Sequence, residues 1–324
     1  MKRNNTVPIN VVLTVGAFVA VFMFFSLLNR SFFRWNNIVA ILMRGTILVP
    51  LSIGVMLSLI VRGIALSAGT TVGLLGVVLT MLIRDGISLP WAIVVIAFAG
   101  IAIGLVNGTL IGVLNMNPFI ATLAVMFIGN SIERVLTQGG LPIYLYGDTS
   151  GLAEVFRGVA AGVPIPIVLL ACVSIATYIT LEKTVFGRRL YATGSSIGGA
   201  TNAGIPVRRY YVAAYAVSSL LAVLSAVLVA SQVRSGQPMV GQSYLWDAIG
   251  AAFLSTIISK KRRPNVAGTV FGVAFLAMVT NGLTILGIAF YWMDFFRGLI
   301  ILFMLLSSVI TIRDSKRRVT IGAS

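Results

Sequence analysis

Residues 182–209 read EKTVFGRRLYATGSSIGGATNAGIPVRR, and this stretch interrupts a chain that is otherwise a series of apolar runs. Small side chains form its centre, and basic residues flank them: Lys183, Arg188, Arg189, Arg208 and Arg209. Loops rich in lysine and arginine face the cytoplasm in membrane proteins. A connection of this length between otherwise short turns is often functional. The stretch therefore predicts a cytoplasmic docking element in a multi-pass membrane protein.

The composition of the 324 residues excludes several classes of function. With 58% hydrophobic residues and a mean hydropathy of +1.01, the chain lies far from the averages of soluble proteins. The net charge of +16 comes from short basic clusters between apolar runs, which indicates membrane topology and not a nucleic-acid-binding face. One cysteine and no histidine remove disulfides, thiol clusters and the commonest acid/base group. We expect no catalytic site, no metal site and no cofactor bound by this chain.

The apolar runs predict an all-α membrane protein with about ten transmembrane helices, since a span needs about 20 apolar residues. The expected spans are 9–28, 45–61, 69–83, 90–114, 118–137, 163–181, 210–230, 244–258, 266–287 and 292–312. The first apolar run is too long for a signal peptide and is interpreted as a span. An even number of spans places both termini in the cytoplasm. On this topology Arg30, Arg34 and Arg44 lie outside, against the positive-inside rule.

The two halves of the chain resemble each other. A shift of 174 residues carries Val106-Asn107-Gly108 onto Thr280-Asn281-Gly282, and spans two to five onto spans seven to ten. Because the sixth span lies between the two sets, their orientations in the membrane are opposite. Inverted repeats of this kind place the substrate route at the interface between the halves.

Polar residues inside spans are the candidates for a translocation path, because they are costly in lipid. The candidates are Asn107, Thr109, Asn130, Thr280 and Asn281. Their neutral donors and acceptors would suit a sugar that must be released. The alternative is that they hydrogen-bond neighbouring helices to one another. Glycines recur every four residues along span four, at Gly100, Gly104, Gly108 and Gly112, which predicts close helix packing.

Three motifs carry a resemblance to a known family. They are Thr184–Gly194 followed by Ala203-Gly204-Ile205-Pro206-Val207, the run Asn117–Leu123, and Thr280–Leu283. In this order and spacing, over nearly the whole chain, they resemble the membrane permease subunit of bacterial ABC importers for monosaccharides, the ribose and autoinducer-2 type of the branched-chain permease superfamily. The resemblance implies a single permease domain over residues 1–324, in the bacterial inner membrane. Its function would be ATP-driven import of a monosaccharide or sugar-like molecule.

The resemblance also implies the partners. The segment 182–209 would form the cytoplasmic coupling helix that docks into a cleft of an ATPase subunit. The coupling residues would be Gly194, Ser196, Gly198, Gly199, Ala200, Asn202, Ala203 and Gly204. This chain has no Walker motif, so ATP and Mg would bind the separate ATPase. Further expected partners are a second permease subunit, a periplasmic or extracellular sugar-binding protein and membrane lipid, but no nucleic acid.

Two departures from the family pattern favour a heterodimeric permease. Where the family has Gly-Gly-Ile-Asp-Leu-Ser, this chain reads Arg62-Gly-Ile-Ala65-Leu-Ser67. Where the family has a glycine-rich turn after span eight, this chain has the basic run Lys260–Arg263. A more typical partner would supply the missing groups, while a homodimer remains an alternative.

Two other transport functions stay open. A branched-chain amino acid ABC permease would want paired charges for the carboxylate and ammonium groups of its substrate. An ion-coupled secondary transporter would want a carboxylate at mid-membrane, whereas the acidic residues here are expected near span ends or in loops. Asp247, for example, is expected beside Trp246 at the membrane interface, near the outer end of span eight.

Overall fold

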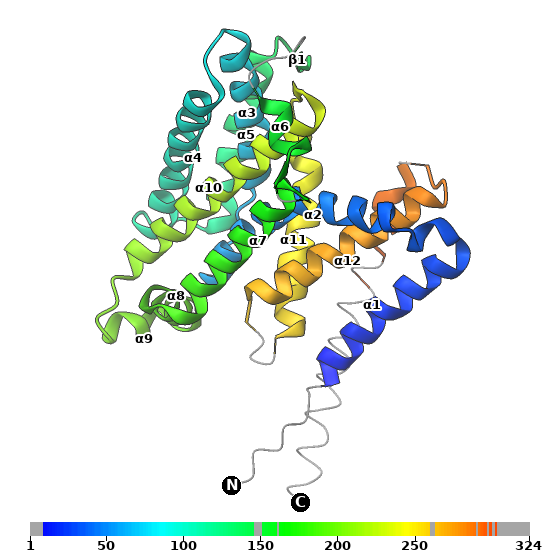
Figure 1. Cartoon of the computed structure of the whole chain (residues 1–324). Helices are drawn as coiled ribbons and strands as arrows, with labels where there is room; N and C mark the ends of the chain where they lie inside the picture. Colours follow the sequence, from blue (N-terminus) through cyan, green and yellow to red (C-terminus); the bar gives the residue numbers. More distant parts are fainter. Residues whose placement is uncertain are drawn as a thin grey trace, which may run out of the picture.

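A computed structural model describes residues 9–145, 151–160, 162–259, 263–289, 291–296, 298–299 and 302. The described chain is a bundle of long helices joined by short connections (Figure 1). The helices are α1 (Ile9–Leu28), α2 (Trp35–Ile60), α3 (Ser67–Arg84), α4 (Leu89–Gly112), α5 (Pro118–Leu136), α6 (Leu152–Arg157), α7 (Ile165–Tyr178), α8 (Val185–Ser195), α9 (Ile197–Asn202), α10 (Val207–Val233), α11 (Val240–Ile258) and α12 (Val266–Ile285).

Short elements complete the connections. A 3-10 turn, Arg30–Phe33, precedes α2, and a π-helical turn, Ile179–Lys183, extends α7 toward α8. Two pairs of two-residue antiparallel strands occur, β1 (Ile143–Tyr144) with β4 (Ser235–Gly236) and β2 (Val159–Ala160) with β3 (Val163–Pro164). The β1–β4 pair joins the connection after α5 to the connection after α10.

Among the described residues, seven helices are long and apolar enough to cross a membrane. They are α2, α3, α4, α5, α7 with its π-helical turn, α10 and α12. The apolar part described for α1 is shorter, Phe18–Leu28, and α11 carries Gln242, Ser243 and Asp247 in its first half. The prediction of a helical membrane protein is confirmed, while the number of ten spans stays a prediction. Most of the expected tenth span, 292–312, lies outside the described residues.

The long helix α10 packs against α2, α3 and α4 near the centre of the bundle. On α4, a Cβ added to Gly104 would lie 2.6 Å from the Cα of Ala216, and one added to Gly108 would lie 2.6 Å from the Cα of Val212. The α4 and α10 backbones therefore touch, which only residues without a side chain allow. The prediction that the glycines of span four serve close helix packing is confirmed.

Helix α2 begins ten residues before the expected span, so Arg44 lies inside a helix and can contact Asp247 on α11. Arg44 lies within α2, and its Nη2 is 3.9 Å from Oδ2 of Asp247 on α11. Asp247 is only 4% exposed, whereas the neighbouring Trp246 is 66% exposed. Asp247 is therefore buried and faces α2, while its predicted position at the membrane interface stays a prediction.

The bundle has two ends of different character (Figure 1). One end carries α8, α9, the end of α2, the start of α10 and residues 263–265. We call it the α8–α9 end. Its described basic residues are Arg62, Lys183, Arg188, Arg189, Arg208, Arg209 and Arg263. The opposite end carries the β1–β4 pair and α6, and there Asp85, Glu133 and Glu154 lie among the basic residues.

Candidate functional site

The segment 182–209 folds as two short helices that meet at a corner. Thr184 caps the start of α8 by accepting a hydrogen bond from the backbone N–H of Gly187, at 3.4 Å. Ser196 has an extended backbone, ends α8, and caps α9 by accepting from the N–H of Gly199, at 3.1 Å. Side-chain oxygens in these places satisfy donors that a helix start leaves free. The corner at Ser196 turns α9 away from α8.

One side of this segment packs on the chain's own bundle. Leu190, Thr193 and Gly194 of α8 are buried, and so is Ala200 of α9, at 4% exposure. A Cβ at Gly194 would collide with the backbone carbonyl of Ile60, at the end of α2. Two of the predicted coupling residues, Gly194 and Ala200, therefore face inward, and their small size serves contacts within the chain.

The other predicted coupling residues are exposed. They are Ser196, Gly198, Gly199, Asn202, Ala203 and Gly204, and together with Ile197 we call them the α9 surface. Ile197 is 48% exposed at its centre. A Cβ at Gly198 would meet no described atom within 4 Å. Nothing in the described chain covers this surface, and its role in docking stays a prediction.

A hollow of about 380 Å³ lies beside the α9 surface. It is lined by the turn between α4 and α5, by α9 and by the start of α10, with Asn115, Met116, Ile197, Thr201, Arg208 and Tyr211 among its residues. The α9 surface is thus a ridge next to a depression, at the basic end of the bundle.

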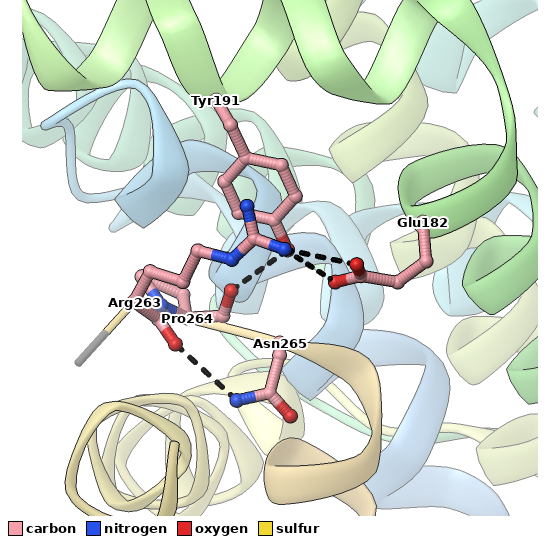
Figure 2. A network of polar contacts seen from close by, with 5 residues as sticks. All are labelled: Glu182, Tyr191, Arg263, Pro264 and Asn265. Carbon is pink, nitrogen blue, oxygen red and sulfur yellow. Dashed lines mark hydrogen bonds and ion pairs between the residues drawn. The ribbon is translucent and has the colours of Figure 1, made fainter. Parts of the chain in front are cut away.

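Residues 263–265 clasp the start of α8, as Figure 2 shows. Arg263 Nη2 lies 2.9 Å from Oε2 and 3.1 Å from Oε1 of Glu182, and its guanidinium carbon is 3.9 Å from the ring centre of Tyr191. The Tyr191 hydroxyl donates to the carbonyl of Pro264 at 2.9 Å. Burial raises the pKa of Tyr191 to about 12, and the nearby Glu182 charge adds to the shift. The other members of the predicted basic run, residues 260–262, lie outside the described residues.

A second contact holds the end of α8. Arg62 follows α2 with a left-handed backbone, φ 59°. Its Nε and Nη2 donate to the carbonyls of Gly194 and Ser195. Sequence reasoning noticed Arg62 only as part of a motif that departs from the family. The signal that could have marked it is a long basic side chain in a position where the resembled family has glycine.

The predicted path residues lie on three helices, and two of them contact the first turn of α3. Asn107 is buried, and its Nδ2 donates to Ser67 Oγ on α3 at 2.9 Å. Asn130 accepts from Thr70 Oγ1, also on α3, at 2.9 Å. Thr109 is exposed, Thr280 is buried and Asn281 is half-buried. None of the five lines the hollow beside α9. For Asn107 and Asn130 these contacts match the alternative, hydrogen bonding between helices, and the translocation role of all five stays a prediction.

Glu133 is a buried carboxylate that sequence reasoning missed. It lies near the end of α5, fully buried, and its Oε1 accepts from the backbone N–H of Met239 at 2.7 Å. A Cβ at Gly73 of α3 would collide with this carboxylate. Glu133 therefore ties α5 to the start of α11, across α3. Its signal in the sequence is an acidic residue next to Arg134 in an otherwise apolar helix.

Comparison with known proteins shows what the chain is similar to. The profile of the family described as "Branched-chain amino acid transport system / permease component" matches residues 37–305. The ribose import permease protein RbsC of Bacillus subtilis is 32% identical over 90% of this chain and 90% of its own length. RbsC of Escherichia coli is 29% identical over 87% and 88%, and the autoinducer 2 import system permease protein LsrC of Photorhabdus luminescens is 27% identical over 90% and 87%. No solved structure matches the chain significantly.

Proposed function

From the premise that the chain belongs to the branched-chain amino acid transport system permease family, we propose that it is the transmembrane subunit of an ATP-driven importer for a monosaccharide or sugar-like molecule. The observation that carries the proposal is the α9 surface at the basic end of the bundle. Relatives named as permeases for ribose and for autoinducer 2 align over about nine tenths of the chain and support this substrate class.

The α9 surface suits docking of a cytoplasmic ATPase. Gly198, Ala203 and Gly204 expose backbone with little side-chain bulk, and Ile197 adds an apolar contact between them. Small residues allow the backbone of another protein to approach closely. ATP and Mg would then be held by the ATPase, and its closure would push on α9. The hollow beside α9 could receive a side chain of the same partner.

The proposed topology has ten spans, an inverted repeat and both termini in the cytoplasm. Helix bounds support the repeat: α3 and α11 start 173 residues apart, and α4 and α12 end 173 residues apart. Helix pairing supports it too, because α4 packs on α10 while α12 packs on α2, and α3 packs on α10 while α11 packs on α2. If α2, α3 and α4 correspond to α10, α11 and α12, each contact in one half has its counterpart in the other. We call α2–α5 the first half and α10 onward the second half. The basic α8–α9 end would face the cytoplasm.

A second permease subunit completes the proposed transporter, and we favour a different chain over a second copy. Two copies would bring the Lys260–Arg263 runs to one cytoplasmic surface, where like charges repel within the screening length of about 8 Å. A sugar-binding protein would meet the opposite end of the bundle, where β1, β4 and α6 lie.

The second candidate, transport of a branched-chain amino acid, is favoured by the description of the matching family. Uptake experiments distinguish the two. The chain is reconstituted in liposomes with an ATPase, a second permease subunit and a binding protein sought in the neighbouring reading frames, and uptake of labelled ribose, of other monosaccharides and of leucine is compared. ATP-dependent uptake of a monosaccharide supports the proposal. Uptake of leucine alone supports the second candidate, and uptake without ATP would overturn both in favour of ion coupling.

A further inference from the structure

We propose that Arg62 and Arg263 are positioning residues that fasten α8 to both halves of the bundle, so that a push on α9 reaches both halves and changes their relative position. The proposal rests on the proposed function, because it assumes that an ATPase acts on the α9 surface. It assigns a role to two arginines for which the comparison with known proteins indicates none.

Arg62 fastens the end of α8 to α2, in the first half. Because Ser196 is extended, the carbonyls of Gly194 and Ser195 lack the partners that a continuing helix would supply. The Arg62 guanidinium donates to both carbonyls, at the end of a helix where a positive charge is favourable. Arg62 itself has φ 59°, a conformation that costs a residue with a side chain energy. The fixed two-pronged shape of arginine matches two neighbouring acceptors.

Arg263 fastens the start of α8 to α11 and α12, in the second half. It makes a bidentate contact with Glu182, just before α8, and stacks on Tyr191 within α8. Asn265, two residues on, caps α12 by accepting from the N–H of Gly268 at 2.8 Å. The same side chain donates to the carbonyl of Ser255, on α11, at 3.0 Å. Residues 263–265 thus join α8 to both helices of this half.

The two contacts hold one short helix at two places: Arg62 at its last turn, and Arg263 at Glu182 just before the helix and at Tyr191 within it. Helix α8 has 11 residues, about 16 Å at 1.5 Å per residue. Arg62 acts at its last turn, beside the corner that leads into α9, and Glu182 lies two residues before its capping residue Thr184. A displacement of α9 is therefore passed to α2 through Arg62 and to α11 and α12 through Arg263. Without either arginine, α8 can tilt and part of the displacement is lost.

The experiment uses the full complex with its ATPase and takes nucleotide as the probe. Spin labels are placed at Val135 on α5 and Val233 on α10, which are 75% and 43% exposed at the end opposite α8, in a Cys172→Ser background. The change in label distance between the nucleotide-free and ATP–vanadate states measures coupling. Arg62→Gly removes the guanidinium while suiting the left-handed backbone, and Arg263→Gln removes the clasp. The paired reversal Glu182→Arg with Arg263→Glu restores opposite charges.

We expect both single variants to bind the ATPase and hydrolyse ATP within twofold of wild type, while the change in label distance falls at least threefold. The paired reversal should recover at least half of the change, which a general loss of stability would not allow. An undiminished change in both single variants would overturn the inference. A second outcome would also overturn it: the single variants lose both ATPase binding and the change in label distance, and the paired charge reversal restores neither. That outcome indicates a structural or docking role. If the wild-type chain itself binds no ATPase, the proposed function fails first and the inference with it.

Discussion

The buried and exposed sides of the 182–209 segment both contain small residues, but for different reasons. On the buried side, Gly194 leaves room for the Ile60 carbonyl, and Ala200 fits against the bundle. On the exposed side, Gly198 has no described neighbour that a side chain would meet. Small residues alone therefore do not mark a docking surface. Packing within the chain explains the small residues on the buried side. On the exposed side, the proposed reason is a partner outside the chain.

The largest effect expected from breaking this comparison is at Gly194. Gly194→Leu drives a side chain into the Ile60 carbonyl and displaces α8 from α2. The carbonyls that accept from Arg62 then move out of its reach. Overpacking of this severity costs about 3 kcal/mol. The matched control is Gly198→Leu, the same change four residues later in open space. Thermal unfolding in detergent should show a much lower Tm for the first variant and an unchanged Tm for the second. Equal Tm values for the two would refute the assignment of sides.

A somewhat smaller loss of stability is expected for Ala200→Arg. The new guanidinium would be buried beneath α9 without a prepared partner, at a cost of about 2 kcal/mol after the side chain bends toward solvent. Asn202→Arg, on the exposed face of the same helix, is the control and should unfold at the wild-type temperature. The measurement is again thermal unfolding, in the absence of any ATPase. An unaltered Tm for Ala200→Arg would mean that this residue belongs to the α9 surface.

Sequence reasoning reached the helices and the exposed residues of the site, because long apolar runs and runs of small residues are local signals. It could not tell the two sides of the segment apart, since Gly194 and Gly198 look alike until the end of α2 is placed beside one of them. It missed Glu133, and it did not foresee that Asp247 is buried, for a related reason. Both side chains are buried by helices distant in sequence.

On the exposed side the expected effect is on binding and not on stability. Gly198→Trp leaves the bundle intact but places a large side chain where the ATPase would approach. We expect the affinity for the ATPase to fall at least tenfold, about 1.4 kcal/mol, with an unchanged Tm. Co-purification and titration with the ATPase measure it, and Val159→Trp, exposed at the opposite end, serves as control. Normal capture of the ATPase by Gly198→Trp would remove the α9 surface from the proposal.

The smallest effect expected concerns Tyr191, whose hydroxyl contributes one contact to the clasp on the buried side. Tyr191→Phe keeps the ring under Arg263 but removes the hydrogen bond to the Pro264 carbonyl, a loss of about 1 kcal/mol.

Burial raises the pKa of the Tyr191 phenol from 10.0 to about 12, so the folded chain holds this proton more tightly than the unfolded chain. The stabilisation is therefore complete below pH 10 and is lost as the pH rises through 10 toward 12. Wild-type Tm should fall more steeply than that of Tyr191→Phe across this alkaline range. Parallel pH profiles for wild type and Tyr191→Phe would show that the phenol is not held in the clasp. The clasp would then consist of the Arg263 contacts with Glu182 and with the Tyr191 ring.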